Sequence, residues 1–182
     1  MREISALKDD RVEADELYDR PSVKEIDKEE IVNLAEQSLY FGFICAYAQG
    51  MHQLAEASKE YSYDLDLKLV AKIWRAGCII RAELLEDIMK AFTDNKDIVN
   101  LLMAPSFVSK VNETVNAARK LVGYAVSSAI PVPGLSNSLT YFDAFTASEL
   151  PLNLIQAQRD YFGSHTYERK DMKGIFHTKW NK

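Results

Sequence analysis

Hydrophobic positions along this chain recur mostly every three or four residues, and no region shows sustained alternation of apolar and polar residues. The first pattern is typical of amphipathic helices, whereas strict alternation would indicate half-buried strands. Glycine (7) and proline (5) are both scarce, so turns should be few and elements long. The sequence therefore predicts an all-α domain of about seven or eight helices without an internal repeat.

The longest predicted helix covers residues 27–61, with Asp27 as its N-cap. Between residues 39 and 48 nearly every position is apolar, and a helix that is apolar all round is usually buried. We therefore expect this helix to be the central one. Gly42 and Gly50 would destabilise an isolated helix, so we expect both to allow a second helix to approach closely.

Shorter helices are predicted around the central one. Their ranges are 2–18, 65–75, 78–92, 97–103, 106–129 (capped by Ser106), 135–150 and a last helix with Pro151 in its first turn. The prolines of "IPVPG" separate two of them, because prolines this close together cannot continue a helix. Trp74 and Cys78 are expected in the core, with Gly77 at a close helix contact.

Two parts are expected in the chain. Residues 1–169 form the helical domain, and residues 170–182 form an extended, irregular tail. The tail carries Ile175, Phe176 and Trp180 but is too short to bury them on itself. Because exposed apolar residues of this kind usually mark an interaction surface, we expect the tail to need a partner.

The charge of the chain is unevenly distributed. Residues 1–30 contain six Lys/Arg and eleven Asp/Glu, which accounts for the net charge of −5, and the other 16 basic and 16 acidic residues balance. An acidic protein is poorly suited to non-specific nucleic-acid binding, which needs many cations. The longest apolar run, "LYFGFICAYA", has ten residues, whereas a bilayer span needs about 20. We therefore expect a protein that binds neither nucleic acid nor membrane.

Motifs for metals and nucleotides do not occur in the sequence. His52, His165 and His177 lack metal-ligand spacing and clustered Cys or carboxylate residues. Neither GxGxxG nor GxxxxGKS/T is present. Cys45 and Cys78 lie within apolar strings, which favours free thiols in a reducing compartment. We expect a cytoplasmic protein with no metal centre.

The stretch "IQAQRDYFGSHTYERK" carries the candidate binding residues. Ile155, Arg159 and Phe162 share one helix face, so Arg159 has apolar neighbours. A guanidinium in such a setting binds phosphate or carboxylate in bidentate fashion. His165 would point elsewhere on a continuing helix, but a left-handed Gly163 can end the helix and turn the chain back. Arg159 and His165 could then contact one anionic ligand.

A structural interpretation of the same residues is open as well. Arg159 can pair with a neighbouring carboxylate such as Asp160 or Glu149, while His165 satisfies a carbonyl at the helix end. The six carboxylates between positions 9 and 19 are expected on a solvated helix face. Taken without further information, these residues favour the structural interpretation.

Five strings occur in a fixed order along the chain. They are "SLYFGFICAYAQGMHQL" (38–54), "IWRAGCIIRAELL" (73–85), "IPVPGLSNSLTYFD" (130–143), "LPLNLIQAQRDYFGSHTYER" (150–169) and "GIFHTKWN" (174–181). Together they resemble the C-terminal part of decarboxylating 6-phosphogluconate dehydrogenase, over essentially all 182 residues. The strings "QRDYFGSHTYE" and "WRAGCIIR" are the most specific.

The resemblance implies an activity. Enzymes of this family oxidise 6-phosphogluconate with NADP, and a 3-keto intermediate then loses CO2 to give ribulose 5-phosphate in the pentose phosphate pathway. The family's coenzyme domain, general base and general acid precede the portion that resembles this chain. We therefore expect the chain to hold no catalytic residue and to be inactive alone.

The resemblance also assigns roles in substrate binding and assembly. It implies a homodimer in which Arg159 binds the substrate phosphate of the partner's active site and His165 contacts the substrate. Arg2, in "REISALKDDR", matches a second phosphate-binding arginine. Ser164 stands where alanine is common in the family. The tail would cross the partner subunit, which accounts for its apolar residues.

Two alternatives remain open at this point. The chain can be a stand-alone helical module for dimerisation or ligand binding, without catalysis. It can also belong to another β-hydroxyacid dehydrogenase with a different acid substrate, although the phosphate-binding arginines would then have no purpose.

Overall fold

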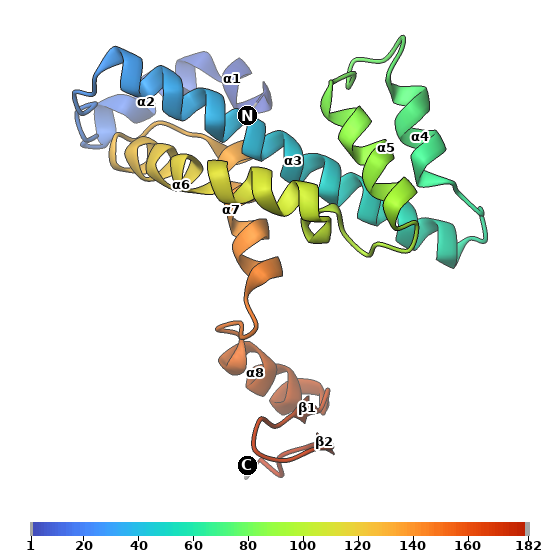
Figure 1. The fold of residues 1–182 in the computed structure, drawn as a ribbon. Coiled ribbons are helices and arrows are strands. Elements are labelled where there is room, and N and C mark those ends of the chain that lie inside the picture. The colour runs from blue at the N-terminus through green and yellow to red at the C-terminus, as the bar shows by residue number, and fades with distance from the viewer. Residues whose placement is uncertain (1, 181–182) are drawn as a thin grey trace. The chain divides into compact units, whose positions relative to one another are not determined.

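The computed structural model describes residues 2–180, which form eight α-helices, one 3-10 helix and two short strands (Figure 1). The predicted all-α class is confirmed. The chain divides into two compact units, the first ending at Phe142 and the second beginning at Asp143. The elements are α1 (Arg2–Ala6), α2 (Lys8–Leu17), α3 (Lys28–Glu60), α4 (Leu67–Trp74), α5 (Leu84–Asp94), η1 (Leu101–Met103), α6 (Pro105–Ser127), α7 (Pro133–Thr146), α8 (Asn153–Gly163), β1 (Tyr167–Glu168) and β2 (Ile175–Phe176).

Helix α3 is the central element of the first unit. Its predicted N-cap is confirmed, because the Asp27 carboxylate accepts hydrogen bonds from the backbone N–H groups of Glu29 and Glu30 at 2.9 and 3.0 Å. Helix α6 runs beside α3 (Figure 1), and α4 packs on α5. The largest fully buried apolar side chains are Phe41, Ile44, Met51, Leu85, Ile88, Leu101 and Phe107. These residues form one core built around α3.

Within the described residues of the first unit, α3 is buried along one face. Leu39 and Phe43 lie within the string that is apolar all round, yet both are about half exposed. A Cβ atom at Gly42 would lie 3.0 Å from Cδ2 of Leu135, so the predicted close approach is found there. Nothing lies within 4 Å of a Cβ atom at Gly50, so the same prediction is wrong for Gly50.

The segment between α4 and α5 differs from the prediction. Residues 78–83 form turns rather than the first part of a helix, and the Ile79 side chain is fully exposed. Gly77 has a φ angle of +68°, with nothing near its missing Cβ, so it serves the turn and not a helix contact. Trp74 and Cys78 are half-buried at the edge of the core rather than inside it.

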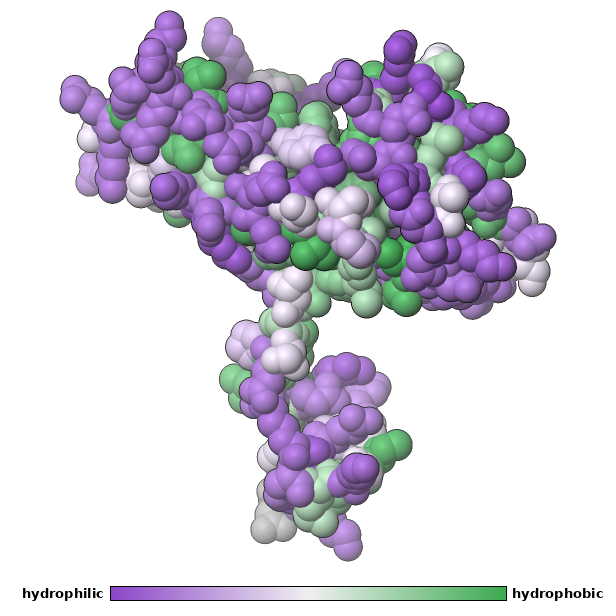
Figure 2. Space-filling model, in the orientation of Figure 1, coloured by the Kyte–Doolittle hydropathy of each residue, from purple (hydrophilic) through white to green (hydrophobic). Residues whose placement is uncertain are grey.

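The first predicted helix is two helices, α1 and α2, separated at Leu7. None of residues 2–25 is buried, and the acidic residues between positions 9 and 19 are solvated as predicted. Hydrophilic side chains accordingly dominate this part of the visible face in Figure 2. Arg20 donates a hydrogen bond of 2.8 Å to the carbonyl of Ala129, just after α6, and the carbonyl of Lys24 accepts one of 2.9 Å from the hydroxyl of Tyr124 in α6.

Three helix starts also differ from the prediction. Only Leu101–Met103 of the predicted helix 97–103 is helical, and it is a 3-10 turn. Helix α6 begins at Pro105, because proline suits the first helical position, so Ser106 is not its cap. Helix α8 begins at Asn153, two residues after Pro151. No helix among residues 2–180 is long and apolar enough to cross a bilayer.

Candidate functional site

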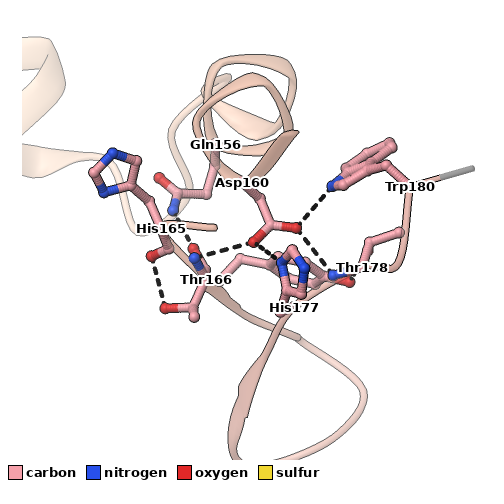
Figure 3. A network of polar contacts seen from close by, with 8 residues as sticks. Gln156, Asp160, His165, Thr166, His177, Thr178 and Trp180 are labelled. Carbon is pink, nitrogen blue, oxygen red and sulfur yellow. Dashed lines mark hydrogen bonds and ion pairs between the residues drawn. The ribbon is translucent and has the colours of Figure 1, made fainter. Parts of the chain in front are cut away.

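Asp160 is the only buried residue of α8, and its side chain is fully shielded from solvent. Its carboxylate is the centre of the polar network shown in Figure 3. Oδ1 accepts the backbone N–H of Thr166 at 3.0 Å and contacts Nδ1 of His177 at 2.9 Å. Oδ2 accepts the backbone N–H of Thr178 and the indole N–H of Trp180, both at 3.0 Å. Both oxygens are therefore satisfied from segments outside α8.

These donors set the charge of the Asp160 carboxyl. Burial by itself raises its pKa, but hydrogen bonds from the His177 ring, the Thr178 backbone and the Trp180 indole outweigh burial and lower the pKa to about 2. Asp160 is thus ionised at neutral pH. Because an ionised carboxylate can only accept hydrogen bonds, Nδ1 of His177 must carry the proton of the pair.

The tail folds onto α8 more closely than its sequence suggests. Strands β1 and β2 pair antiparallel, with Tyr167 opposite Phe176, and the Tyr167 hydroxyl lies 2.6 Å from Oγ1 of Thr178. The Trp180 ring meets the ring of Tyr161 edge to face at 5.7 Å between centroids. Phe176 is half-buried in this arrangement, whereas Ile175 is 75% exposed.

Arg159 is not paired with either carboxylate that the structural interpretation offered. Glu149 forms an ion pair with Lys170 at 2.5 Å, and Asp160 is bound by the tail. The contact that the structure shows for the Arg159 guanidinium, among residues 2–180, is a 3.4 Å hydrogen bond to Oε1 of Gln156. The guanidinium is therefore exposed and available to an anion.

The apolar neighbours expected around Arg159 do not shield it within this chain. Ile155 is 53% exposed and Phe162 is 75% exposed. The shared face predicted from their spacing lies on α8, but it faces solvent in the described part of the chain. A dry environment for the guanidinium would therefore need a surface that covers this face.

The bend before His165 is present, but Gly163 does not make it. Gly163 is the last helical residue, and Ser164 adopts the left-handed conformation with φ 51° and ψ 39°. A Cβ atom at position 163 would lie 2.9 Å from both Cδ2 and Nε2 of His165. The absence of a side chain at Gly163 thus leaves room for the imidazole in this position, whereas the prediction had attributed the role of Gly163 to its backbone freedom. The His165 ring points away from the Asp160 carboxylate (Figure 3).

Several residues of the network were missed or misassigned from sequence, among them Gln156 and Thr178. Asp160 was considered only as a partner for Arg159, and Thr166 was not considered. A buried carboxylate needs several donors, and the string "HTKW" after β2 supplies three of them, from the His177 and Trp180 side chains and from the Thr178 backbone. That cluster of donors was the signal available in the sequence.

Arg2 lies exposed in α1, within the first unit, while Arg159 and His165 belong to the second. Its place beside a substrate phosphate stays a prediction. Among residues 2–180, no group of three His, Cys, Asp or Glu side chains is arranged to hold a metal ion.

Comparison with known proteins identifies the family of this chain. The family described as 6-phosphogluconate dehydrogenase, C-terminal domain, matches residues 1–180. The chain belongs to this family. A relative named 6-phosphogluconate dehydrogenase, decarboxylating, from Escherichia coli (strain K12) is 49% identical over 180 residues, which are 98% of this chain and 38% of the relative. One of the same name from Lactococcus lactis is 46% identical over the same shares.

The fold of the 6-phosphogluconate dehydrogenase family is found in solved structures as well. A Plasmodium falciparum 6-phosphogluconate dehydrogenase superimposes with a TM-score of 0.89 at 39% identity, covering 98% of this chain and 39% of that one. That enzyme is described in its apo form, with its cofactor NADP+ and with its substrate 6-phosphogluconate. The resemblance stated from the five sequence strings is thereby confirmed, and the chain spans about two fifths of the length of these relatives.

Proposed function

We propose that this chain is the C-terminal part of an NADP-dependent 6-phosphogluconate dehydrogenase, which converts 6-phosphogluconate into ribulose 5-phosphate and CO2. The names of its relatives and their high identity support this activity. The observation that carries the proposal is the guanidinium of Arg159, exposed and bound to neither neighbouring carboxylate, six residues from an exposed imidazole.

The role of the chain in this reaction is substrate binding. Arg159 donates two parallel hydrogen bonds to the phosphate and keeps its charge at every working pH. His165 contacts the substrate, and Arg2 provides a second cation for the phosphate. Holding the sugar phosphate in this way orients its reacting carbon towards base and nicotinamide, which lowers the entropic part of the barrier.

The proposal includes a homodimer in which this site is completed across the interface. Every apolar side chain of α8 lies outside the buried set, with Leu154 82% and Phe162 75% exposed. Hydrophobic side chains are visible among hydrophilic ones on the second unit in Figure 2. A second subunit that covers α8 and the tail would bury these apolar side chains. It would also exclude water from the surroundings of Arg159.

The coenzyme and the cellular location are part of the same proposal. NADP+ would be bound mainly by the portion of the enzyme that the relatives have and this chain does not span. The isolated chain should therefore be inactive. Two free cysteines, Cys45 and Cys78, support a reducing, cytoplasmic environment.

The direct test is a chimera. This chain replaces the matched segment of the Escherichia coli relative, and NADPH formation from 6-phosphogluconate is followed by absorbance. We expect NADPH formation and CO2 release from the chimera and none from the chain alone. A folded, dimeric chimera without activity would contradict the proposal and would favour a stand-alone binding module. Activity with a non-phosphorylated 3-hydroxy acid in place of 6-phosphogluconate would favour a different dehydrogenase.

A further inference from the structure

The backbone on both sides of His165 is held in an unusual conformation. Ser164 and Thr166 both have positive φ angles, 51° and 61°. Side chains with a Cβ disfavour this region, and a β-branched threonine disfavours it most. Such a conformation persists only where surrounding contacts determine it. The contacts that hold these residues therefore also determine where His165 lies.

Thr166 is fixed at each of its polar groups. Its N–H donates to Oδ1 of Asp160 at 3.0 Å, and its carbonyl accepts a hydrogen bond from Nε2 of Gln156. Its hydroxyl donates to the carbonyl oxygen of His165 at 2.6 Å. Asp160 and Gln156 lie one turn apart on α8, so the helix holds the backbone of the bend directly (Figure 3).

Asp160 is held in turn by the tail. His177, Thr178 and Trp180 supply three of its four hydrogen bonds, and no solvent reaches the carboxylate. A buried carboxylate that loses its donors is strongly destabilised, so its position depends on the tail remaining in place. The tail, Asp160 and Thr166 are thus joined in one hydrogen-bond network.

The imidazole of His165 is exposed and lies against the end of α8. It lies against Gly163, where even one methyl group would come within 2.9 Å of two ring atoms. The ring therefore lies beside a glycine that leaves room for it, and the next residue of the chain is a threonine whose backbone α8 holds in place.

We propose that Asp160 is a positioning residue for His165, and that the C-terminal tail of each chain acts on the substrate site through this carboxylate. Asp160 does not touch the substrate. Its ionised oxygens accept the Thr166 N–H and the three tail donors, with Oδ1 shared between Thr166 and His177, and this fixes the backbone at His165. The expected effect of Asp160 on the binding of 6-phosphogluconate rests on the proposed function. Its effect on the position of His165 does not depend on that function.

The first experiment uses Asp160→Asn in the active chimera. The amide keeps the shape of the carboxyl group but offers one acceptor oxygen in place of two, so at least one N–H loses its acceptor. We expect KM for 6-phosphogluconate to rise about tenfold with a smaller fall in kcat, because ground-state positioning of the substrate is weakened. Asp171→Asn is the matched control: this exposed carboxylate binds Arg169 in the same unit, and its loss should leave KM unchanged.

A milder variant keeps the test informative if Asp160→Asn does not fold. Trp180→Phe removes the indole N–H that Asp160 accepts but retains an aromatic ring against Tyr161. We expect a KM increase of about threefold and a smaller fall in melting temperature than in Asp160→Asn, since one of four hydrogen bonds to the carboxylate is lost.

The second experiment measures His165 directly in the 182-residue chain. Its ring C–H signals are assigned by NMR from their loss in His165→Gln. We expect them to shift and broaden in Asp160→Asn and Trp180→Phe and to stay in place in Asp171→Asn. Unchanged His165 signals together with unchanged KM in both test variants would overturn the positioning role. An inactive unsubstituted chimera would instead contradict the proposed function, and the NMR result would still decide the role of Asp160.

Discussion

Nδ1 of His177 lies 2.9 Å from Oδ1 of Asp160, although the two residues are 17 positions apart in the sequence. This contact joins the tail to α8, and the hydrogen bonds of Thr178 and Trp180 to the other carboxylate oxygen reinforce it. The attachment depends on an ionised carboxyl group that is fully buried. Among the described residues of the second unit, the fully buried side chain is thus a charged one, and no apolar side chain is buried there.

Acid should release the tail. The pKa of Asp160 is lowered to about 2 in the folded chain, whereas an unfolded aspartate titrates near 3.8. The contribution of Asp160 to the stability of the attached tail is complete above the pKa that its carboxyl group has in the unfolded chain. It is lost as pH falls from about 4 towards about 2, because the carboxyl group takes up a proton when the tail is released. The fluorescence of Trp180, observed in a Trp74→Phe background, should report this transition.

The control for acid release is Asp160→Asn, which has no carboxyl group to protonate. Its Trp180 emission should resemble that of the released tail at neutral pH and should not change between pH 4 and pH 2. An identical acid transition in the two proteins would assign the transition to other carboxylates.

Loss of the Arg159 guanidinium should weaken substrate binding. In the chimera, Arg159→Ala is expected to raise KM for 6-phosphogluconate roughly 10- to 100-fold with a smaller loss in kcat, because a hydrogen bond to a charged group contributes about 1.5–3 kcal/mol. Arg169→Ala is the matched control, since Arg169 binds Asp171 through both its Nε and Nη2. The measurement is steady-state kinetics. Equal KM values for the two variants would contradict a role of Arg159 in substrate binding.

The two glycines of α3 should respond differently to alanine. At Gly50 the added methyl group meets nothing within 4 Å, so Gly50→Ala should stabilise the protein by up to about 1 kcal/mol through helix propensity. At Gly42 the methyl group would lie 3.0 Å from Leu135, so displacement of that side chain should cancel some or all of this gain. Denaturant unfolding measures both values. An equal gain at both sites would show that the contact with Leu135 adjusts without cost.

The two cysteines should differ in reactivity. Burial raises the pKa of Cys45 to about 12, so its thiol stays protonated and unreactive, whereas Cys78 is only partly buried. A disulfide reagent at mildly alkaline pH should therefore label Cys78 alone in the native protein and both thiols in denaturant. In Cys78→Ser, native labelling should disappear; labelling of Cys45 there would contradict its burial in the core.

Local signals in the sequence were sufficient for most helices. The periodic apolar stripe, the Asp27 cap and the prolines of "IPVPG" each act within a few residues, and α3, α6 and α7 follow them. The predicted helices are wrong where a local pattern of residues fits both a helix and a turn. The string "GCIIRA" fits a helical stripe, yet the positive φ of Gly77 starts a turn and leaves Ile79 in solvent.

The binding roles of Arg159 and His165 stay predictions. The structure leaves both side chains exposed at the end of α8. What sequence spacing did not show is how they are held. The contacts of Asp160 connect it to residues up to 20 positions away, and no periodicity relates such positions.

The sequence by itself determined the helical class, the long central helix, the family and the residue types available to bind an anion, because each of these is a property of short strings or of their order. Only the tertiary structure decided which carboxylate is buried, that Ser164 rather than Gly163 makes the bend, and that the tail holds α8 through Asp160. The physical reason is that burial and hydrogen-bond geometry depend on which distant segments meet, and these contacts exist only once the chain has folded.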